Sequence, residues 1–158
     1  MKIILNKEYG GFSVSLMAYK LYAEKKGIEL YAYYGDYSNY PSQGIVVYRK
    51  IDWIVPSLLE YHNNNSRSLY YFTKNLGESI IESEENKEEV NEIFVKYSFY
   101  LGKQNRKDPI LIEVVEELGN KANGSVSNLR VVEIPDELDY VIDDYDGYET
   151  LHQKVKIW

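Results

Sequence analysis

The chain has 158 residues, of which 44% are apolar and 27% charged, with a formal net charge of −7 and no cysteine. This size and composition indicate one domain with a buried core, and they exclude a disordered chain and any disulfide or thiolate chemistry. The negative charge argues against long nucleic acid as a partner, and no apolar run approaches the roughly 20 residues that span a bilayer. We therefore expect a single domain over residues 1–158 that resides in the cytosol, away from membranes.

The N-terminal segment predicts a strand followed by a helix. Residues 2–6 read as a short buried strand, and a glycine turn then leads to apolar residues at helical spacing from Val14 onward. Ser13 is the predicted N-cap of this helix, and Gly27 is its predicted stop.

The middle of the chain predicts strands separated by loops. Strands are expected at residues 28–34, 45–49 and 68–73, with a turn-rich loop at residues 35–44. Residues 53–61 are ambiguous, and residues 63–66 read as a loop.

An acidic run follows, with seven glutamates and one lysine between Glu78 and Glu92. Such runs are usually solvated helix faces or variable insertions, here at about residues 75–95. The alternative is a functional acidic patch that steers a basic partner. Residues 95–101 alternate aromatic and polar side chains, which favours a strand.

The C-terminal third contains the clearest helix. Asp108 is a favourable N-cap and Pro109 a favourable first residue, and an apolar stripe runs from there to a stop at Gly119. Strands are expected at residues 129–134 and from residue 140, with a hairpin turn at Asp146–Gly147. Because the order of elements lacks regular strand–helix alternation, it predicts an α+β fold, with a mostly antiparallel sheet and two main helices packed on one face.

The turn before the first helix is a candidate ligand site. Gly10, Gly11, Phe12 and Ser13 precede a predicted helix start, where free backbone amides attract an anion. A plain tight turn is the equally open alternative. Arg106 could reach a phosphate near the second helix, whereas a surface cation with no ligand is the simpler interpretation.

Tyrosine is unusually frequent, with 17 residues against 4 phenylalanines. Most of these rings are expected to fill strands, but some could stack on a nucleotide base or face another subunit. Tyr145 and Tyr148 are the candidates for stacking.

Catalytic and metal-binding patterns are incomplete. The acidic turn Asp143–Gly147 fails as a calcium loop, because the first ligand position becomes Ile142 and the last Gln153. His62 and His152 have no partner motif. No catalytic residue, metal site or cofactor is therefore predicted, and we expect a protein that is not an enzyme.

Several short motifs nevertheless form a recognisable set. They are Tyr9–Ser15, the Arg-x-Asp-Pro of residues 106–109, the Val-Val-Glu-Glu-Leu-Gly of residues 114–119, the Val-Val-Glu-Ile-Pro-Asp of residues 131–136, and the Tyr-Asp-Gly-x-Glu of residues 145–149. This set resembles a family of small, uncharacterised bacteriophage proteins, over the first 25 residues and the last 55 or so. The ending Lys154–Trp158 departs from the basic-aromatic tail of that family in its cations.

The resemblance implies a viral protein that acts in the host cytoplasm, where small phage proteins often counter host defences. Our leading expectation is a homo-oligomer that binds and sequesters a cyclic or ADP-ribose-derived nucleotide signal without catalysis. Its candidate ligand-binding residues are Gly10, Gly11, Phe12, Ser13, Arg106, Tyr145 and Tyr148. The alternative is an acidic phage protein that directly binds and inhibits a host defence or metabolic enzyme, with the run Glu78–Glu92 as its contact surface.

Overall fold

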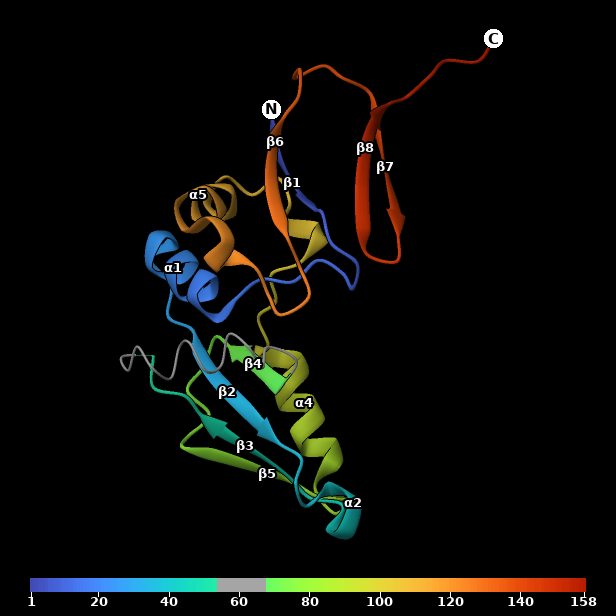
Figure 1. The fold of residues 1–158 in the computed structure, drawn as a ribbon. Helices are drawn as coiled ribbons and strands as arrows, with labels where there is room; N and C mark the ends of the chain where they lie inside the picture. The colour runs from blue at the N-terminus through green and yellow to red at the C-terminus, as the bar shows by residue number, and fades with distance from the viewer. Residues whose placement is uncertain (54–67) are drawn as a thin grey trace. The chain divides into compact units, whose positions relative to one another are not determined.

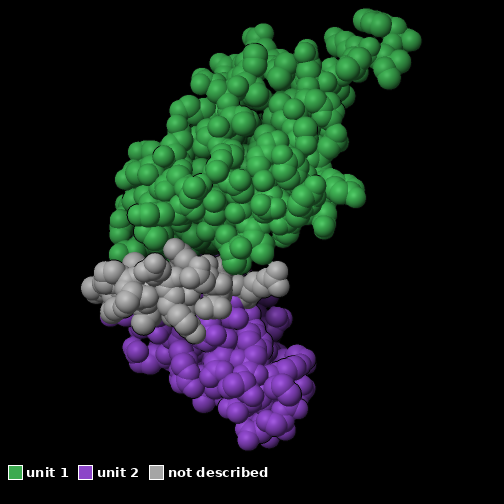
Figure 2. Space-filling view, in the orientation of Figure 1, with its two compact units in different colours: residues 1–25, 101–158 green, residues 26–100 purple. Residues whose placement is uncertain are grey.

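The computed structural model describes residues 1–53 and 68–158, and it confirms the α+β class. The chain forms two compact units, one of residues 1–25 and 101–158 and the other of residues 26–100 (Figure 2). We call them unit 1 and unit 2. Two compact units can belong to one domain or to two, so the single domain stays a prediction. Among the described helices, none has the length and apolar character needed to cross a membrane.

Unit 1 contains two small antiparallel sheets (Figure 1). In the first, β1 (Lys2–Asn6) pairs with β6 (Leu129–Glu133). The second is the predicted hairpin of β7 (Tyr140–Tyr145) and β8 (Tyr148–Gln153). Its two-residue turn has φ values of 51° at Asp146 and 91° at Gly147, the positive pair that a type I′ turn requires.

Two helices complete the core of unit 1. Helix α1 (Leu16–Lys26) lies beside α5 (Pro109–Leu118), and the Lys25 ammonium bridges to Glu113 and Glu117 on α5 at 3.0 and 2.9 Å. Asp108 caps α5 as predicted, since its side chain accepts a hydrogen bond from the Ile110 amide at 2.9 Å. Short 3₁₀ turns precede and follow α5, at Lys103–Asn105 (η2) and Gly119–Ala122 (η3).

The predicted start of the first helix is wrong by two residues. Ser15, not Ser13, supplies the capping oxygen, which accepts from the Ala18 amide at 3.1 Å. The Ser15 amide donates to the Ala122 carbonyl at 2.9 Å. This contact with a distant segment fixes where the helix begins.

Unit 2 is a four-stranded antiparallel sheet in the order β4-β2-β3-β5. Its strands are β2 (Tyr31–Asp36), β3 (Val46–Lys50), β4 (Leu69–Phe72) and β5 (Ser79–Glu82). The short helix α2 (Tyr40–Gln43) joins β2 to β3, and α4 (Lys87–Tyr97) packs Phe94 and Tyr97 against the core of the sheet. That core consists of Tyr33, Val46, Tyr48 and Phe72.

Two predictions, one for unit 2 and one for the sheets of both units, differ from the structure. The strand predicted at residues 95–101 is wrong, because α4 extends to Tyr97 and its apolar residues Val90, Phe94 and Tyr97 recur at helical spacing. The antiparallel strands also form three sheets rather than one. The predictions for residues 54–61 and 63–66 lie outside the described residues, as does His62.

Candidate functional site

The predicted glycine turn packs against the hairpin turn of β7 and β8. The Gly10 amide donates to the Asp146 carbonyl at 2.9 Å. A Cβ atom at Gly147 would lie 2.2 Å from the Gly11 nitrogen, so only glycine allows this close approach. Gly10 and Gly11 themselves have φ values of 111° and 108°. These glycines therefore join two turns, and the Gly10 amide is occupied by protein.

Phe12 and Ser13 also face the protein interior. Phe12 is buried, and the guanidinium of Arg106 lies 5.5 Å from the centroid of its ring. The Ser13 hydroxyl is buried and has no hydrogen-bond partner among the described residues. It lies so close to Gly124 that a Cβ atom there would be 2.2 Å away. Neither side chain is presented to a ligand.

Arg106 forms a buried ion pair with Glu149. Its Nη2 donates to Glu149 Oε2 at 2.6 Å, and its Nη1 reaches Glu149 Oε1 at 3.3 Å and the Ile4 carbonyl at 3.0 Å. The side chains of Arg106 and Glu149 are 13% and 1% exposed. Because Glu149 already neutralises this guanidinium, a phosphate would have to displace a buried carboxylate to bind it.

Tyr145 and Tyr148 do come together, and Tyr9 joins them. The Tyr9 ring centroid lies 5.5 Å from that of Tyr148 and 6.5 Å from that of Tyr145. Tyr9 is 55% exposed, Tyr148 is 37% exposed and Tyr145 is 77% exposed. We call this set the tyrosine triad. No ligand role was predicted for Tyr9, although this residue immediately precedes the glycine turn.

One cation beside the tyrosine triad, Lys7, and the cation that pairs with the residue before Tyr145, Lys103, have partners within the protein. Lys7 Nζ lies 5.2 Å from the Tyr148 ring centroid and donates to the Glu149 carbonyl at 2.5 Å. Lys103 pairs with Asp144. The tyrosine triad is therefore an exposed aromatic surface, and Lys7 beside it is already engaged within the protein.

The acidic turn is held by hydrogen bonds and ion pairs. Asp144 accepts from the Gly147 amide at 2.8 Å, and the hydrogen bonds from Lys103 and this amide hold the pKa of Asp144 below its usual value. His152 Nδ1 lies 3.4 Å from Asp143 Oδ2 on the hairpin. In the part of the chain that the structure describes, no group of three or more potential ligands is placed to hold a metal ion.

Unit 2 contains a cavity of about 220 Å³ that the sequence did not predict. It lies where the β2–β3 connection meets the end of β5 and the start of α4. We call it the tyrosine–glutamate pocket. It is lined by Tyr37, Tyr40, Gly44, Val46, Glu82, Ser83, Glu84 and Lys87.

The wall of this pocket is ordered by packing and hydrogen bonds. The Tyr37 ring packs beside Gly35, where a Cβ atom would lie 2.9 Å from Tyr37 Cε2 and 3.0 Å from Tyr70 Cε2. The hydroxyls of Tyr37 and Tyr70 are hydrogen-bonded, and the Tyr48 hydroxyl donates to Glu82 Oε2 at 2.9 Å. Burial and the hydrogen bond with Glu82 raise the pKa of Tyr48, so this hydroxyl remains a donor to Glu82 at neutral pH.

A short turn holds the acidic side of the pocket. The Asn86 side chain accepts from the Ser83 amide and donates to the Ile81 carbonyl, each at 2.7 Å. Glu82 and Glu84 are thereby presented from a fixed backbone. No local signal predicted the pocket, since its tyrosines and glutamates are more than 40 residues apart in sequence.

The acidic run also exposes carboxylates for which the described residues provide no cationic partner. Residues 78–92 carry seven glutamates and one lysine, a net charge of −6. Glu78 bridges to Lys50 at 3.1 Å. Among the described residues, no ion pair is found for the exposed glutamates on the turn and on α4, which are Glu84, Glu85, Glu88, Glu89 and Glu92.

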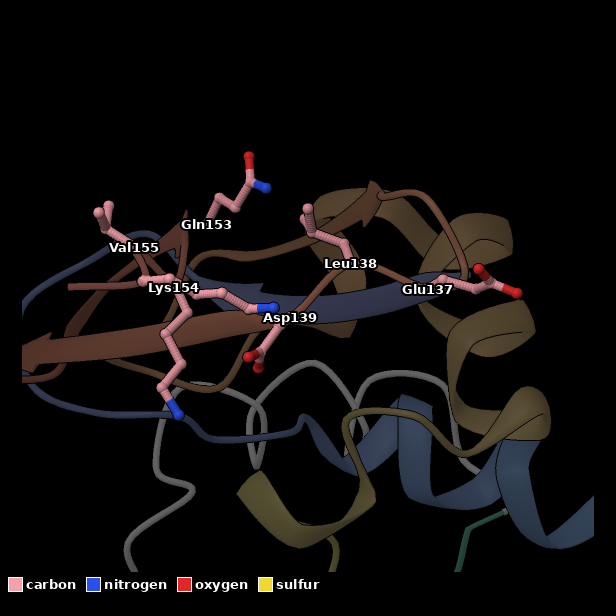
Figure 3. Close-up of a pocket in the computed structure, with 7 residues that line it drawn as sticks. Glu137, Leu138, Asp139, Gln153, Lys154 and Val155 are labelled. Carbon is pink, nitrogen blue, oxygen red and sulfur yellow. The ribbon is translucent and has the colours of Figure 1, made fainter. Parts of the chain in front are cut away.

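Two cavities in unit 1 do not gather converging groups. One, of about 540 Å³, lies between the residues before β7 and the end of β8. In Figure 3, the carboxylate of Glu137 lies apart from that of Asp139, and Gln153 points away from both. The other, of about 430 Å³, lies beside α5, where Lys2 and Glu116 on its wall pair with each other at 3.0 Å.

Comparisons with known proteins add no family to this description. No family model, curated protein or solved structure matches the chain.

Proposed function

We propose that this protein is a non-catalytic binding protein whose partner is another protein with a basic surface. The observation that carries the proposal is the set of exposed glutamates on the turn and α4 of unit 2, for which no ion pair is found within the described ranges 1–53 and 68–158. An ordered helix presents these charges at fixed positions, unlike a solvated tail. Fixed charges of one sign attract and orient an oppositely charged partner.

The tyrosines of unit 2 supply the apolar part of this surface. Tyr37 and Tyr40 are 41% and 55% exposed, and they line the tyrosine–glutamate pocket together with Glu84. Tyrosine is enriched in protein interfaces because its rigid ring buries a large area at a small cost in conformational entropy. Charge alone would give weak, screened attraction, whereas these rings add short-range contact.

The resemblance to small bacteriophage proteins supplies a biological setting for this proposal. In that setting the protein acts in the host cytoplasm, and its partner is a host defence or metabolic enzyme that it inhibits directly. This is the alternative expected from the sequence.

Sequestration of a nucleotide signal by a homo-oligomer is the competing proposal. It receives less support from the geometry, because Arg106 is paired with Glu149 and the Gly10 amide with Asp146. The exposed tyrosine triad could still stack on a base. Incubating the purified protein with candidate nucleotides and then releasing the bound ligand by heat tests this proposal separately.

Affinity capture from bacterial lysate tests the leading proposal. The first variant replaces Glu84, Glu85, Glu89 and Glu92 with glutamine, and the matched control replaces Glu133 and Glu137 with glutamine and Asp139 and Asp143 with asparagine. Each variant changes the formal net charge from −7 to −3. We expect one partner in stoichiometric amount with the native chain and the control, and its loss with the first variant. Equal recovery with both variants would contradict the proposal.

A further inference from the structure

We propose that the tyrosine–glutamate pocket binds the guanidinium group of an arginine side chain. The inference deepens the proposed function, on which it rests for the source of that arginine, namely the basic surface of the protein partner.

The size of the pocket selects a single side chain. Sites for drug-sized ligands enclose about 300–1,000 Å³. The pocket measures about 220 Å³, which is too small for a nucleotide but sufficient for the end of one long side chain.

The chemistry of the wall selects a cation. Glu82 and Glu84 contribute carboxylates to the lining, and Tyr37 and Tyr40 contribute aromatic rings. The rings of Tyr37 and Tyr40 lie edge to face, with centroids 6.5 Å apart. A cation gains from carboxylates and from ring faces together, whereas an anion is repelled by both.

A guanidinium suits this wall better than an ammonium does. It is planar, so it can stack on a tyrosine ring while its N–H groups point at carboxylate oxygens. One oxygen of Glu82 accepts from Tyr48, and no hydrogen bond is found for the other among the described residues. Arginine is also less strongly hydrated than lysine, which lowers the cost of entering a partly enclosed site.

Lys87 is the single cation among the residues that line the pocket. Its ammonium makes the net charge of the lining less negative and repels a second cation that enters the pocket. It is exposed at the first position of α4, where a positive charge interacts unfavourably with the helix dipole. Removing this charge should therefore strengthen arginine binding without unfolding the helix.

Titration of the full chain with a small probe tests the site without the partner. The probe is N-acetyl-arginine amide, and the control is N-acetyl-citrulline amide, which has nearly the same shape and no charge. Chemical shifts of unit 2 amides report binding. We expect saturable binding of the arginine probe, with a Kd at least about tenfold lower than that of the citrulline probe, equivalent to about 1.4 kcal/mol. Equal Kd values for the two probes would overturn the proposal.

Three single variants locate the binding. Glu84→Gln should raise the Kd about fivefold, and Lys87→Gln should lower it by at least about twofold, as expected for single partly exposed charges. Glu133→Gln, in unit 1 and outside the pocket lining, should leave it unchanged. If all three variants bind alike, or if N-acetyl-lysine amide binds as tightly as the arginine probe, the pocket is not a guanidinium site.

The two tests fail independently of each other. Probe binding without partner capture would refute the proposed function and leave the site standing. Partner capture with no probe binding would refute the guanidinium site and leave the proposed function standing.

Discussion

Arg106 and Glu149 form a nearly buried ion pair, with Nη2 of the guanidinium 2.6 Å from Oε2 of the carboxylate. Glu149 also accepts from the Asn6 amide at 2.8 Å, so the pair ties the β7–β8 hairpin to β1 and to the turn before α5. This ion pair stabilises the fold, and for that reason Arg106 is a poor candidate to bind a phosphate.

Replacing Glu149 with glutamine should destabilise the protein. The Arg106 guanidinium would remain buried without a counter-charge, a situation that costs about 3–5 kcal/mol. Urea unfolding followed by circular dichroism measures the loss. Glu116→Gln is the control, since it removes only the exposed pair with Lys2 and should cost about 1 kcal/mol or less. Equal losses in the two variants would show that the pair with Arg106 is not structural.

Gly147→Ala should destabilise the protein more than Gly77→Ala. The two glycines have nearly the same φ, 91° and 90°, so both substitutions carry a backbone cost of about 1–3 kcal/mol. Only Gly147 also meets backbone atoms, with a Cβ atom 2.2 Å from the Gly11 nitrogen. The difference between the two free energies of unfolding isolates that contact. A difference near zero would mean that the two turns do not touch.

Tyr33→Phe should cost about 1–3 kcal/mol. The Tyr33 hydroxyl donates to the Gly77 carbonyl at 2.6 Å and accepts from the Leu76 amide at 2.9 Å, and its ring lies in the core of unit 2. Without the hydroxyl, both backbone groups lose a partner. Tyr31→Phe, whose hydroxyl reaches only exposed Glu29 among the described residues, should change stability by less than about 0.5 kcal/mol.

Stability should fall above pH about 10, in part because of Tyr48. Burial and the hydrogen bond with Glu82 raise the pKa of Tyr48 in the folded protein above its usual value of 10.0. The unfolded chain therefore loses the Tyr48 proton first as pH rises. The contribution of Tyr48 to the free energy of unfolding is complete below the pKa of this residue in the unfolded chain. It is lost as pH rises from there towards the pKa of Tyr48 in the folded protein. Unfolding at several pH values should show a shallower decline in Tyr48→Phe, and an unchanged slope would contradict this role.

Local chemistry was sufficient to predict several elements. Asp108 and Pro109 specify the start of α5 through their own side chains, and Asp146–Gly147 specifies the hairpin turn through its backbone preference. Both predictions are confirmed, because neither feature needs a distant partner.

Distant contacts decided what the sequence could not predict. Residues 95–97 fit a strand pattern as well as a helix, and packing of Phe94 and Tyr97 on the sheet selected the helix. Similarly, the sequence predicted no partner that would prevent Arg106 from binding a phosphate. In the fold, Glu149, 43 residues later in the chain, pairs with Arg106. The tyrosine–glutamate pocket likewise combines two features, frequent tyrosine and a glutamate run, that the sequence shows only separately.

The most direct test of the central claim is the dissociation constant of the captured partner, measured with purified components at low and at high salt. The account predicts that replacing Glu84, Glu85, Glu89 and Glu92 with glutamine weakens binding by about tenfold or more at low salt, and that high salt reduces this difference. The matched control variant in unit 1 should bind as the native chain does. Equal dissociation constants for the native chain and the four-glutamine variant at low salt would contradict the claim that the glutamates of unit 2 form the binding surface.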